Sequence, residues 1–132
     1  MASKTYVVPV DFSKGSEAAL KYAIGVARRK KARLVLVHVV PLVVNMGTLS
    51  GYLRGELEAM AKRLGLKSGE YRLLVLEKGE VAQAIANLAA RVRAAMIIMG
   101  GQGQSGLKRF ILGSVAERTL RAAKCPVLIV RK

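Results

Sequence analysis

Short apolar runs alternate with amphipathic segments along the whole chain. Five runs have the length and β-branched content of buried strands: residues 5–10, 32–40, 71–77, 94–100 and 126–131. Between them, four segments place apolar residues at helical spacing: residues 14–31, 52–65, 80–93 and 114–124. Ser13 is the expected N-cap of the first helix, and Gly65 is the expected end of the second. Residues 41–51 are expected to form a connection.

The order of these elements predicts an open α/β sheet. Continuous apolar strands that alternate with helices are typical of a parallel sheet covered on both faces. Right-handed crossovers then favour a doubly wound, three-layer αβα fold with five parallel strands in the order 3-2-1-4-5. No repeat, linker or second domain is evident, so residues 1–132 are expected to form one domain.

This fold predicts where a ligand would bind. In an open α/β sheet, the binding crevice lies outside the carboxyl ends of the strands, where the strand order switches. Strands one and four flank that switch. The loop after strand one is VDFS (10–13), and strand four leads into the glycine-rich stretch GGQGQSG (100–106). We expect these two loops to face each other across one crevice.

The net charge of +15 is the main anomaly of the composition. A strongly positive chain attracts phosphate in any form, so nucleic-acid binding is an alternative function. The cations are spread along the sequence apart from residues 28–31, and only two Phe and four Tyr accompany them. This distribution favours a solvated basic surface over a platform for stacking bases.

Other features of the composition indicate a soluble cytoplasmic protein without a membrane partner. The single cysteine cannot form an internal disulfide, which fits a reducing compartment. No apolar run reaches the roughly 18–20 residues of a membrane span. The start of the chain, MASKTYVVPVDFS, lacks the layout of a signal peptide.

Three phosphate-binding templates can be compared with the glycine-rich stretch. Gly101, Gly103 and Gly106 spell GxGxxG, but this fingerprint belongs after the first strand of a dinucleotide fold rather than the fourth. A Walker A loop would need lysine where Leu107 stands. The third template fits, because the stretch contains G-x2-G-x9-G-S: Gly100, Gly103, Gly113 and Ser114.

The third pattern has a physical rationale as a phosphate site. Glycines at 100 and 103 remove Cβ atoms where amides would curl around an anion, and they permit positive φ. Ser114 and Glu117 form the pattern of a capping box at the start of the last helix, whose N-terminus would attract phosphate. Lys108 and Arg109 would add charge to the outer phosphates. The alternative is a glycine-rich turn followed by an ordinary helix cap.

The G-x2-G-x9-G-S pattern resembles the ATP-binding signature of the universal stress protein family. VVPVDFSKGSEAALKYA, LVLVHVV, VLEKGEVAQAIANLA and CPVLIVR resemble further segments of that family in the same order. The resemblance implies a fold of the adenine-nucleotide-binding type. It also implies the residues of the site: Pro9, Val10, Asp11 and Val39 around adenine and ribose, Met99, Gly100 and Gly103 beside them, and Gly113, Ser114 and Val115 at the phosphates. Asp11 has an alternative role, an Asx-turn ahead of the first helix.

The resemblance further implies a stress-response protein that binds ATP, AMP or ADP, with Mg²⁺ accompanying the nucleotide. It would act as a nucleotide-dependent switch or sensor through protein partners and as a homodimer through residues 126–131. The alternatives are a nucleotide-free docking module of the same fold and a basic nucleic-acid-binding protein. Gly101 and Gln102 replace the hydroxyl and the Arg or His of many relatives, and Ala95 replaces a common aspartate.

Little in the sequence supports catalysis beyond slow ATP hydrolysis or autophosphorylation at Ser114. His38 is the only histidine, and we expect local hydrogen bonds to satisfy it. No cluster of Cys, His and Asp has the spacing of a metal site. Cys125 is expected to be a small buried residue rather than a reactive thiol.

Overall fold

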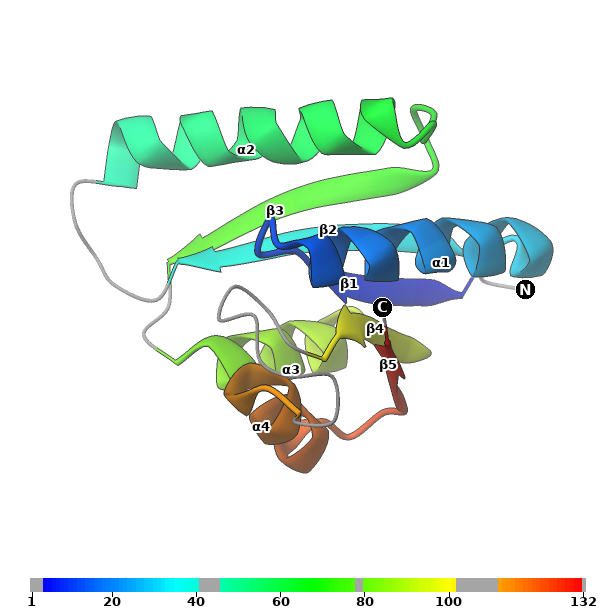
Figure 1. Ribbon diagram of the computed structural model, residues 1–132, viewed down its shortest axis with the longest axis vertical. Helices are drawn as coiled ribbons and strands as arrows, with labels where there is room; N and C mark the ends of the chain where they lie inside the picture. Colours follow the sequence, from blue (N-terminus) through cyan, green and yellow to red (C-terminus); the bar gives the residue numbers. More distant parts are fainter. Residues whose placement is uncertain (1–3, 41–45, 78–79, 102–111, 132) are drawn as a thin grey trace.

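Five parallel strands form one sheet in the order β3-β2-β1-β4-β5, as predicted. The computed structural model describes residues 4–40, 46–77, 80–101 and 112–131 (Figure 1). The strands are β1 (Thr5–Pro9), β2 (Arg33–Val40), β3 (Tyr71–Glu77), β4 (Met96–Gly100) and β5 (Val127–Val130). The helices are α1 (Lys14–Lys30), α2 (Met46–Arg63), α3 (Val81–Arg91) and α4 (Ser114–Ala122).

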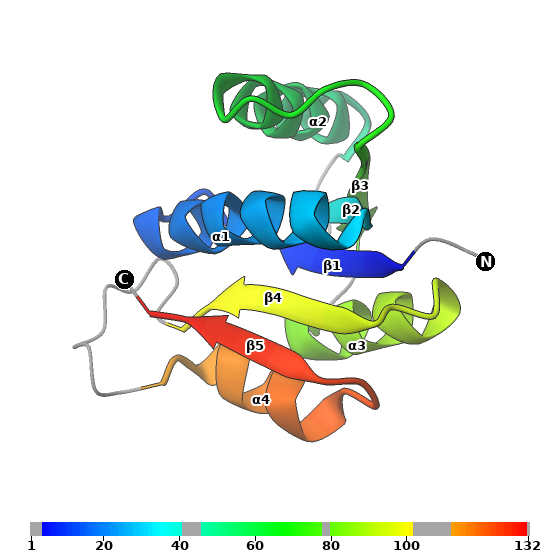
Figure 2. The ribbon, with the colours of Figure 1, turned by 90° about the vertical axis from the view of Figure 1, so that its right-hand side faces the viewer.

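The helices cover both faces of the sheet and complete the three-layer αβα fold. Helices α1 and α2 lie on one face, and α3 and α4 lie on the other (Figure 2). Alternate strand residues therefore enter two separate cores: Val8, Leu36 and Ile98 pack toward α1 and α2, whereas Val7, Val35 and Ile97 pack toward α3 and α4. Because both faces are buried, the strands are continuously apolar rather than alternating.

Helix α2 begins earlier than predicted. The sequence suggests a connection as far as residue 51, because glycine and serine favour helices weakly. The helix starts at Met46 and includes Gly51 and Gly55. Its later turns bury Leu57, Met60 and Ala61 in the core, and this packing outweighs the roughly 1 kcal/mol that each glycine costs in a helix interior.

Three helices end in the same hydrogen-bonded motif. In α2 the amides of Gly65 and Leu66 donate to the carbonyls of Lys62 and Ala61, and Gly65 has φ +90°, which confirms the predicted helix end. Helices α1 and α3 close in the same way around Lys31 and Arg93, at φ 55° and 54°. This left-handed conformation favours glycine, so the two cations occupy strained positions.

No helix in the described part of the chain has the length and apolar content required to cross a membrane.

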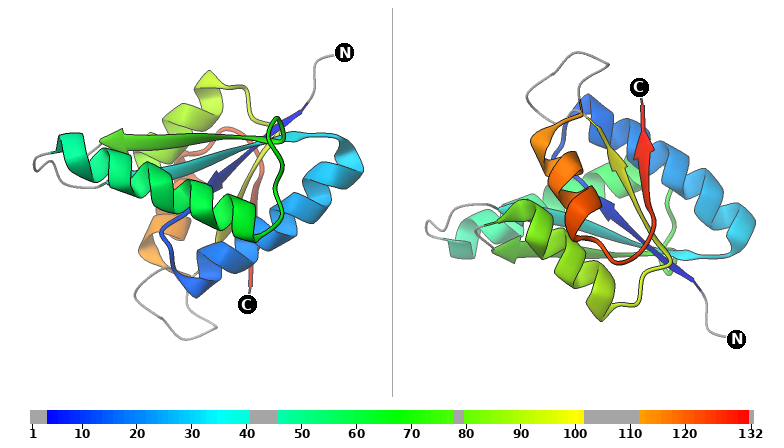
Figure 3. Two further views of the ribbon diagram at one scale, coloured as in Figure 1. Left: turned by 90° about the horizontal axis from the view of Figure 1, so that it is seen from above. Right: turned by 90° about the horizontal axis from the view of Figure 1, so that it is seen from below.

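The predicted N-cap of α1 is confirmed, since the Ser13 side chain accepts a hydrogen bond from the Ser16 amide at 3.1 Å. The N-termini of the helices lie at the end of the sheet where the strands finish, and their C-termini lie at the opposite end (Figure 3). The sheet therefore has a carboxyl end, which carries the helix N-termini, and an amino end, which carries the helix C-termini.

Candidate functional site

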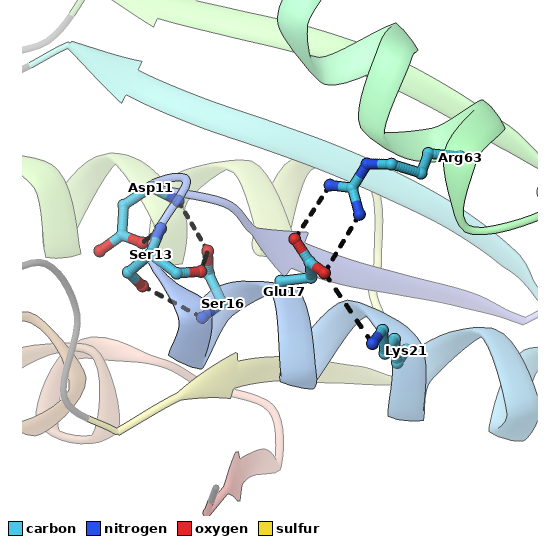
Figure 4. A network of polar contacts seen from close by, with 6 residues as sticks. All are labelled: Asp11, Ser13, Ser16, Glu17, Lys21 and Arg63. Atoms are coloured by element: carbon cyan, nitrogen blue, oxygen red, sulfur yellow. Dashed lines mark hydrogen bonds and ion pairs between the residues drawn. The ribbon is translucent and has the colours of Figure 1, made fainter.

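The loop after β1 turns sharply into α1. The Val10 amide still donates to the Val37 carbonyl of β2 at 2.8 Å, and Phe12 then adopts φ 65°. The Oδ1 of Asp11 accepts a hydrogen bond from the Ser13 amide at 2.9 Å, and the Asp11 amide donates to the Ser16 Oγ at 3.3 Å (Figure 4). The Asx-turn considered as an alternative for Asp11 is therefore present.

Ser16 is a residue of this loop that the sequence reasoning missed. It is 5% exposed, and its hydroxyl also donates to the Ser13 carbonyl at 3.1 Å. The side chain thus links the first turn of α1 to the backbone of Asp11. The spacing D-x-S-x-x-S would have been the signal, because short polar side chains before a helix satisfy neighbouring amides.

His38 also supports the loop after β1. Its Nδ1 donates a hydrogen bond to the Val10 carbonyl at 2.7 Å, and its ring packs against Phe12 with 5.0 Å between ring centroids. The expectation that local hydrogen bonding satisfies this histidine is confirmed. His38 therefore holds the backbone of Val10 and the ring of Phe12 in place.

Gly100 ends β4 against the first turn of α1. A Cβ atom there would lie 2.7 Å from both the carbonyl carbon and the oxygen of Gly15, and 3.2 Å from the Ser16 amide nitrogen. Gly100 does not adopt the positive φ that glycine permits. Glycine is required because two backbone segments approach closely.

The N-terminus of α4 lies against the end of β4. The Gly113 amide donates to the Gly101 carbonyl, and the Glu117 amide donates to the Gly113 carbonyl at 2.9 Å. Gly113 is therefore the N-cap, and Ser114 is the first helical residue. The predicted capping box is wrong, because Ser114 lies one position too late for its side chain to cap the helix.

The predicted site residues meet at the carboxyl end of the sheet, but only some of their side chains face outward. Pro9 ends β1 and Val10 and Asp11 follow it, and Met99 and Gly100 end the neighbouring strand β4. Val10, Val39 and Met99 are at most 7% exposed and pack in the cores. Ser114 and Val115 are exposed at the first turn of α4, whereas Gly103, Lys108 and Arg109 lie outside the described residues.

The electrostatics of this end combine a helix N-terminus with local ion pairs. The first-turn amides of α4 point out of the helix, where the helix dipole contributes about half a positive charge. In α1, Glu17 accepts two hydrogen bonds from Arg63 of α2 at 2.9 and 3.2 Å, and Lys21 lies 3.9 Å away (Figure 4). The hydrogen bonds from Arg63 lower the pKa of Glu17, which keeps this carboxylate ionised.

Among the described residues, groups suited to catalysis are scarce at this end of the sheet. Within residues 4–40, 46–77, 80–101 and 112–131, no three His, Cys, Asp or Glu side chains gather in a cluster able to hold a metal ion. At the opposite, amino end of the sheet, Cys125 precedes β5 and is half-buried, and burial raises the pKa of its thiol. The thiol is therefore less reactive than a free cysteine.

The comparisons with known proteins agree with this arrangement. The sequence pattern of the universal stress protein family matches residues 3–131. A universal stress protein of Methanocaldococcus jannaschii is 33% identical over 98% of this chain and 82% of its own.

Solved structures of the family share the fold. A universal stress protein crystallised with cAMP superposes with a TM-score of 0.74 at 28% identity, over 99% of this chain and 98% of the other. One from Archaeoglobus fulgidus, in complex with dAMP, has the same fold with a TM-score of 0.74 at 24% identity, over 98% of both chains. Sequence, fold and glycine pattern agree, and the chain belongs to the universal stress protein family.

Proposed function

We propose that this protein binds an adenine nucleotide at the carboxyl end of its sheet and acts as a nucleotide-dependent switch in a stress response. The observation that carries the proposal is the hydrogen bond from the Gly113 amide to the Gly101 carbonyl. It sets the N-terminus of α4 beside the end of β4, next to the loop that Asp11 and Ser16 organise. The relative crystallised with cAMP supports the choice of ligand.

The arrangement suggests a division of roles. The amides of Ser114 and Val115 would receive the phosphates, because a helix N-terminus favours anions. The backbone at Pro9, Val10 and Val39 would form the rim for the base, since the valine side chains are committed to the cores. Gly103 would let the nucleotide approach the backbone closely, whereas Gly100 lets the first turn of α1 approach β4.

ATP, with Mg²⁺ bound to its phosphates, is the proposed physiological form of the nucleotide. The metal would enter with the phosphates rather than occupy a prepared protein site, because the described acids do not cluster. Turnover would be slow, since hydrolysis needs a group to orient water and the glycine-rich loop would contact phosphate mainly through its backbone.

The test changes only the charge at the helix N-terminus. In Ser114→Glu, a carboxylate at the first helical position should stabilise α4 by about 0.3–1 kcal/mol through the dipole. The same carboxylate should repel phosphate, so the affinity for ATP or AMP in calorimetric titrations should fall at least tenfold. Ser114→Gln is the matched neutral control and should bind more tightly than the glutamate variant.

The same titrations also distinguish nucleotide binding from the alternative function, a docking module that binds no nucleotide. A docking module without a nucleotide would give no saturable heat with ATP, ADP or AMP for the parent protein. If the parent binds and the glutamate variant binds equally well, the phosphate does not lie at α4, and the proposed geometry is wrong.

A homodimer through β5 is the second part of the proposal. Both β3 and β5 are edge strands of the sheet, but they differ in how well they are protected against pairing with a strand of another molecule. On β3, the Nη1 of Arg54 donates to the Leu73 carbonyl at 2.9 Å, and such a contact blocks strand addition. The residues of β5, VLIV, carry no charge and are half-buried in the single chain.

Sedimentation velocity tests the dimer. Leu128→Lys should shift the protein toward the monomer, because a charge would enter an apolar strand pairing. Leu74→Lys, at a half-buried position of the opposite edge strand, is the control and should leave the association unchanged. If both variants sediment like the parent, β5 is not the interface. A thermal unfolding scan of each variant would detect misfolding.

A further inference from the structure

The amino end of the sheet, opposite the candidate nucleotide site, gathers cations that are scattered in the sequence. Helices α1, α3 and α4 all end there, and each has basic residues in or just after its last turn. The exposed ones are residues 28–31, Arg91, Arg93, Arg121 and Lys124. In Figure 2 these helix ends lie together with the strand starts, on the side where the N-terminus is marked.

The strand starts add cations between those helix ends. Lys4 precedes β1 and Arg33 begins β2, and the Arg33 amide donates to the Lys4 carbonyl at 2.9 Å. Lys67 and Arg72 flank the start of β3 and are exposed. We call these strand-start cations and the helix-end cations of α1, α3 and α4 the basic end.

The basic end is nearly free of acids among the described residues. Of the chain's eight Asp and Glu, only Glu70 lies there, and Arg28 already pairs with it at 3.0 Å. The others follow the strand ends, occupy the first turns of α1 and α4, cap α3 or lie along α2. The dipoles of the three helices place only about −1.5 charges in total at their C-termini. The positive charge of the basic end is much larger than these partial negative charges.

Two cations of the basic end occupy positions where glycine would be more stable. Lys31 and Arg93 have left-handed backbones at the ends of α1 and α3, whereas Gly65 occupies the equivalent position after α2. An L-residue in this conformation costs roughly 1 kcal/mol. The chain therefore carries charge at this surface at the expense of stability, which is typical of functional surfaces.

The row of strand starts has the dimensions of a polyanion contact. Five strands spaced about 4.8 Å apart span roughly 19 Å from β3 to β5. A nucleic-acid duplex carries one charge per about 1.7 Å of its axis, so a stretch of this length holds about eleven phosphate charges on its two strands. Arginines, which recognise phosphate in a bidentate manner, make up a large part of the row and its flanks.

The surface lacks the features of other anion-binding surfaces. The exposed large hydrophobic side chains of the described chain are Tyr22, Leu49, Tyr52, Leu112, Val115 and Leu120, and of these only Leu120 lies near the basic end. An anionic membrane would be bound more firmly with apolar side chains to insert. Single strands would need exposed rings for stacking, and Tyr6 and Tyr71 at this end are buried or half-buried.

We propose that the basic end is a second binding surface, which holds the phosphate backbone of duplex nucleic acid without sequence preference. It lies at the other end of the sheet from the candidate nucleotide site and does not depend on nucleotide binding there. If about five cations contact phosphates, log Kd should change with log salt by roughly 4–5, and Kd should be about 10⁻⁴–10⁻⁶ M at physiological salt.

The experiment measures fluorescence anisotropy of a labelled random 20-base-pair DNA duplex at several salt concentrations. The triple variant Lys4→Gln, Arg33→Gln, Arg93→Gln should weaken binding at least tenfold at low salt. Each lost contact should lower the salt slope by about 0.9. The control triple Lys14→Gln, Lys21→Gln, Arg118→Gln removes the same charge from other exposed positions and should bind nearly like the parent.

Three results would overturn the proposal. One is an equal loss in both triple variants, because binding would then depend on net charge rather than on this surface. The second is the absence of salt-dependent duplex binding by the parent. The third is tighter binding to vesicles containing 30% phosphatidylserine, or to a single strand of equal length, than to the duplex. Calorimetric titration with AMP should be unchanged in the triple variant of the basic end, and the circular dichroism spectrum of each triple shows that it folds.

Discussion

Replacement of Gly100 by alanine tests the close approach on which the candidate site depends. The new methyl group would lie 2.7 Å from two backbone atoms of Gly15 and 3.2 Å from the Ser16 amide nitrogen. Carbon atoms prefer separations of about 3.5–4.0 Å, so the first turn of α1 would have to move by roughly 1 Å. Backbone cannot rotate away as a flexible side chain does.

The expected magnitude follows from two opposing effects. Overpacking of a rigid contact costs about 1–3 kcal/mol. Alanine also reduces the entropy of the unfolded chain, which returns roughly 0.5–1 kcal/mol. The free energy of unfolding of Gly100→Ala should therefore fall by about 1–2 kcal/mol. Because Ser16 moves with the turn and holds the Asp11 amide, nucleotide affinity should fall as well.

Urea unfolding followed by circular dichroism measures the change, with Gly55→Ala as the matched control. Gly55 lies inside α2, and a Cβ atom there would meet no other atom within 4 Å. The control should stabilise the protein by about 0.5–1 kcal/mol, since alanine favours the helix. The same substitution thus has opposite signs at the two sites. A Gly100→Ala variant as stable as the parent would refute the close-contact argument.

Two further predictions concern the amino end. The hydrogen bond from Arg28 lowers the pKa of Glu70 from 4.5 to about 2, so the stability from this pair should be lost as pH falls from about 4.5 to about 2. Unfolding of Glu70→Gln measured across that range should show a flatter pH profile; an unaltered profile would contradict the assignment. Lys31→Gly should raise the free energy of unfolding by about 0.5–1 kcal/mol, because glycine relieves the left-handed strain; a less stable variant in urea would count against it.

The architecture could be predicted because both faces of every strand are buried. Continuous apolar runs such as residues 5–10 and 32–40 leave a parallel sheet as the simple solution, and the structure has the predicted strand order. The start of α2 could not be predicted, since packing of its later turns outweighs the local preference of Gly51. The N-cap of α4 is Gly113 rather than Ser114, one residue earlier than predicted. The Gly113 amide is held by the Gly101 carbonyl just after β4, and this contact is not visible in the local sequence.

The candidate site was harder to predict in its details than in its location. The glycine pattern located the end of β4 and the start of α4, but it could not show that Gly100 serves the contact with α1. Val10, Val39 and Met99 lie at the carboxyl end of the sheet, as expected, yet their side chains pack in the cores. The basic end was invisible in sequence, because Lys4, Arg33 and Arg93 are far apart until the strands align.

Amide spectra of the isotopically labelled protein during titration with AMP test the central claim most directly. If the nucleotide binds at the N-terminus of α4, saturable shifts should appear at Gly101, Gly113, Ser114 and Val115 and in the loop around Asp11, with little change at Lys31, Arg33 and Arg93. Shifts confined to the basic end, or no saturable shifts at millimolar nucleotide, would contradict the proposed nucleotide site at the N-terminus of α4.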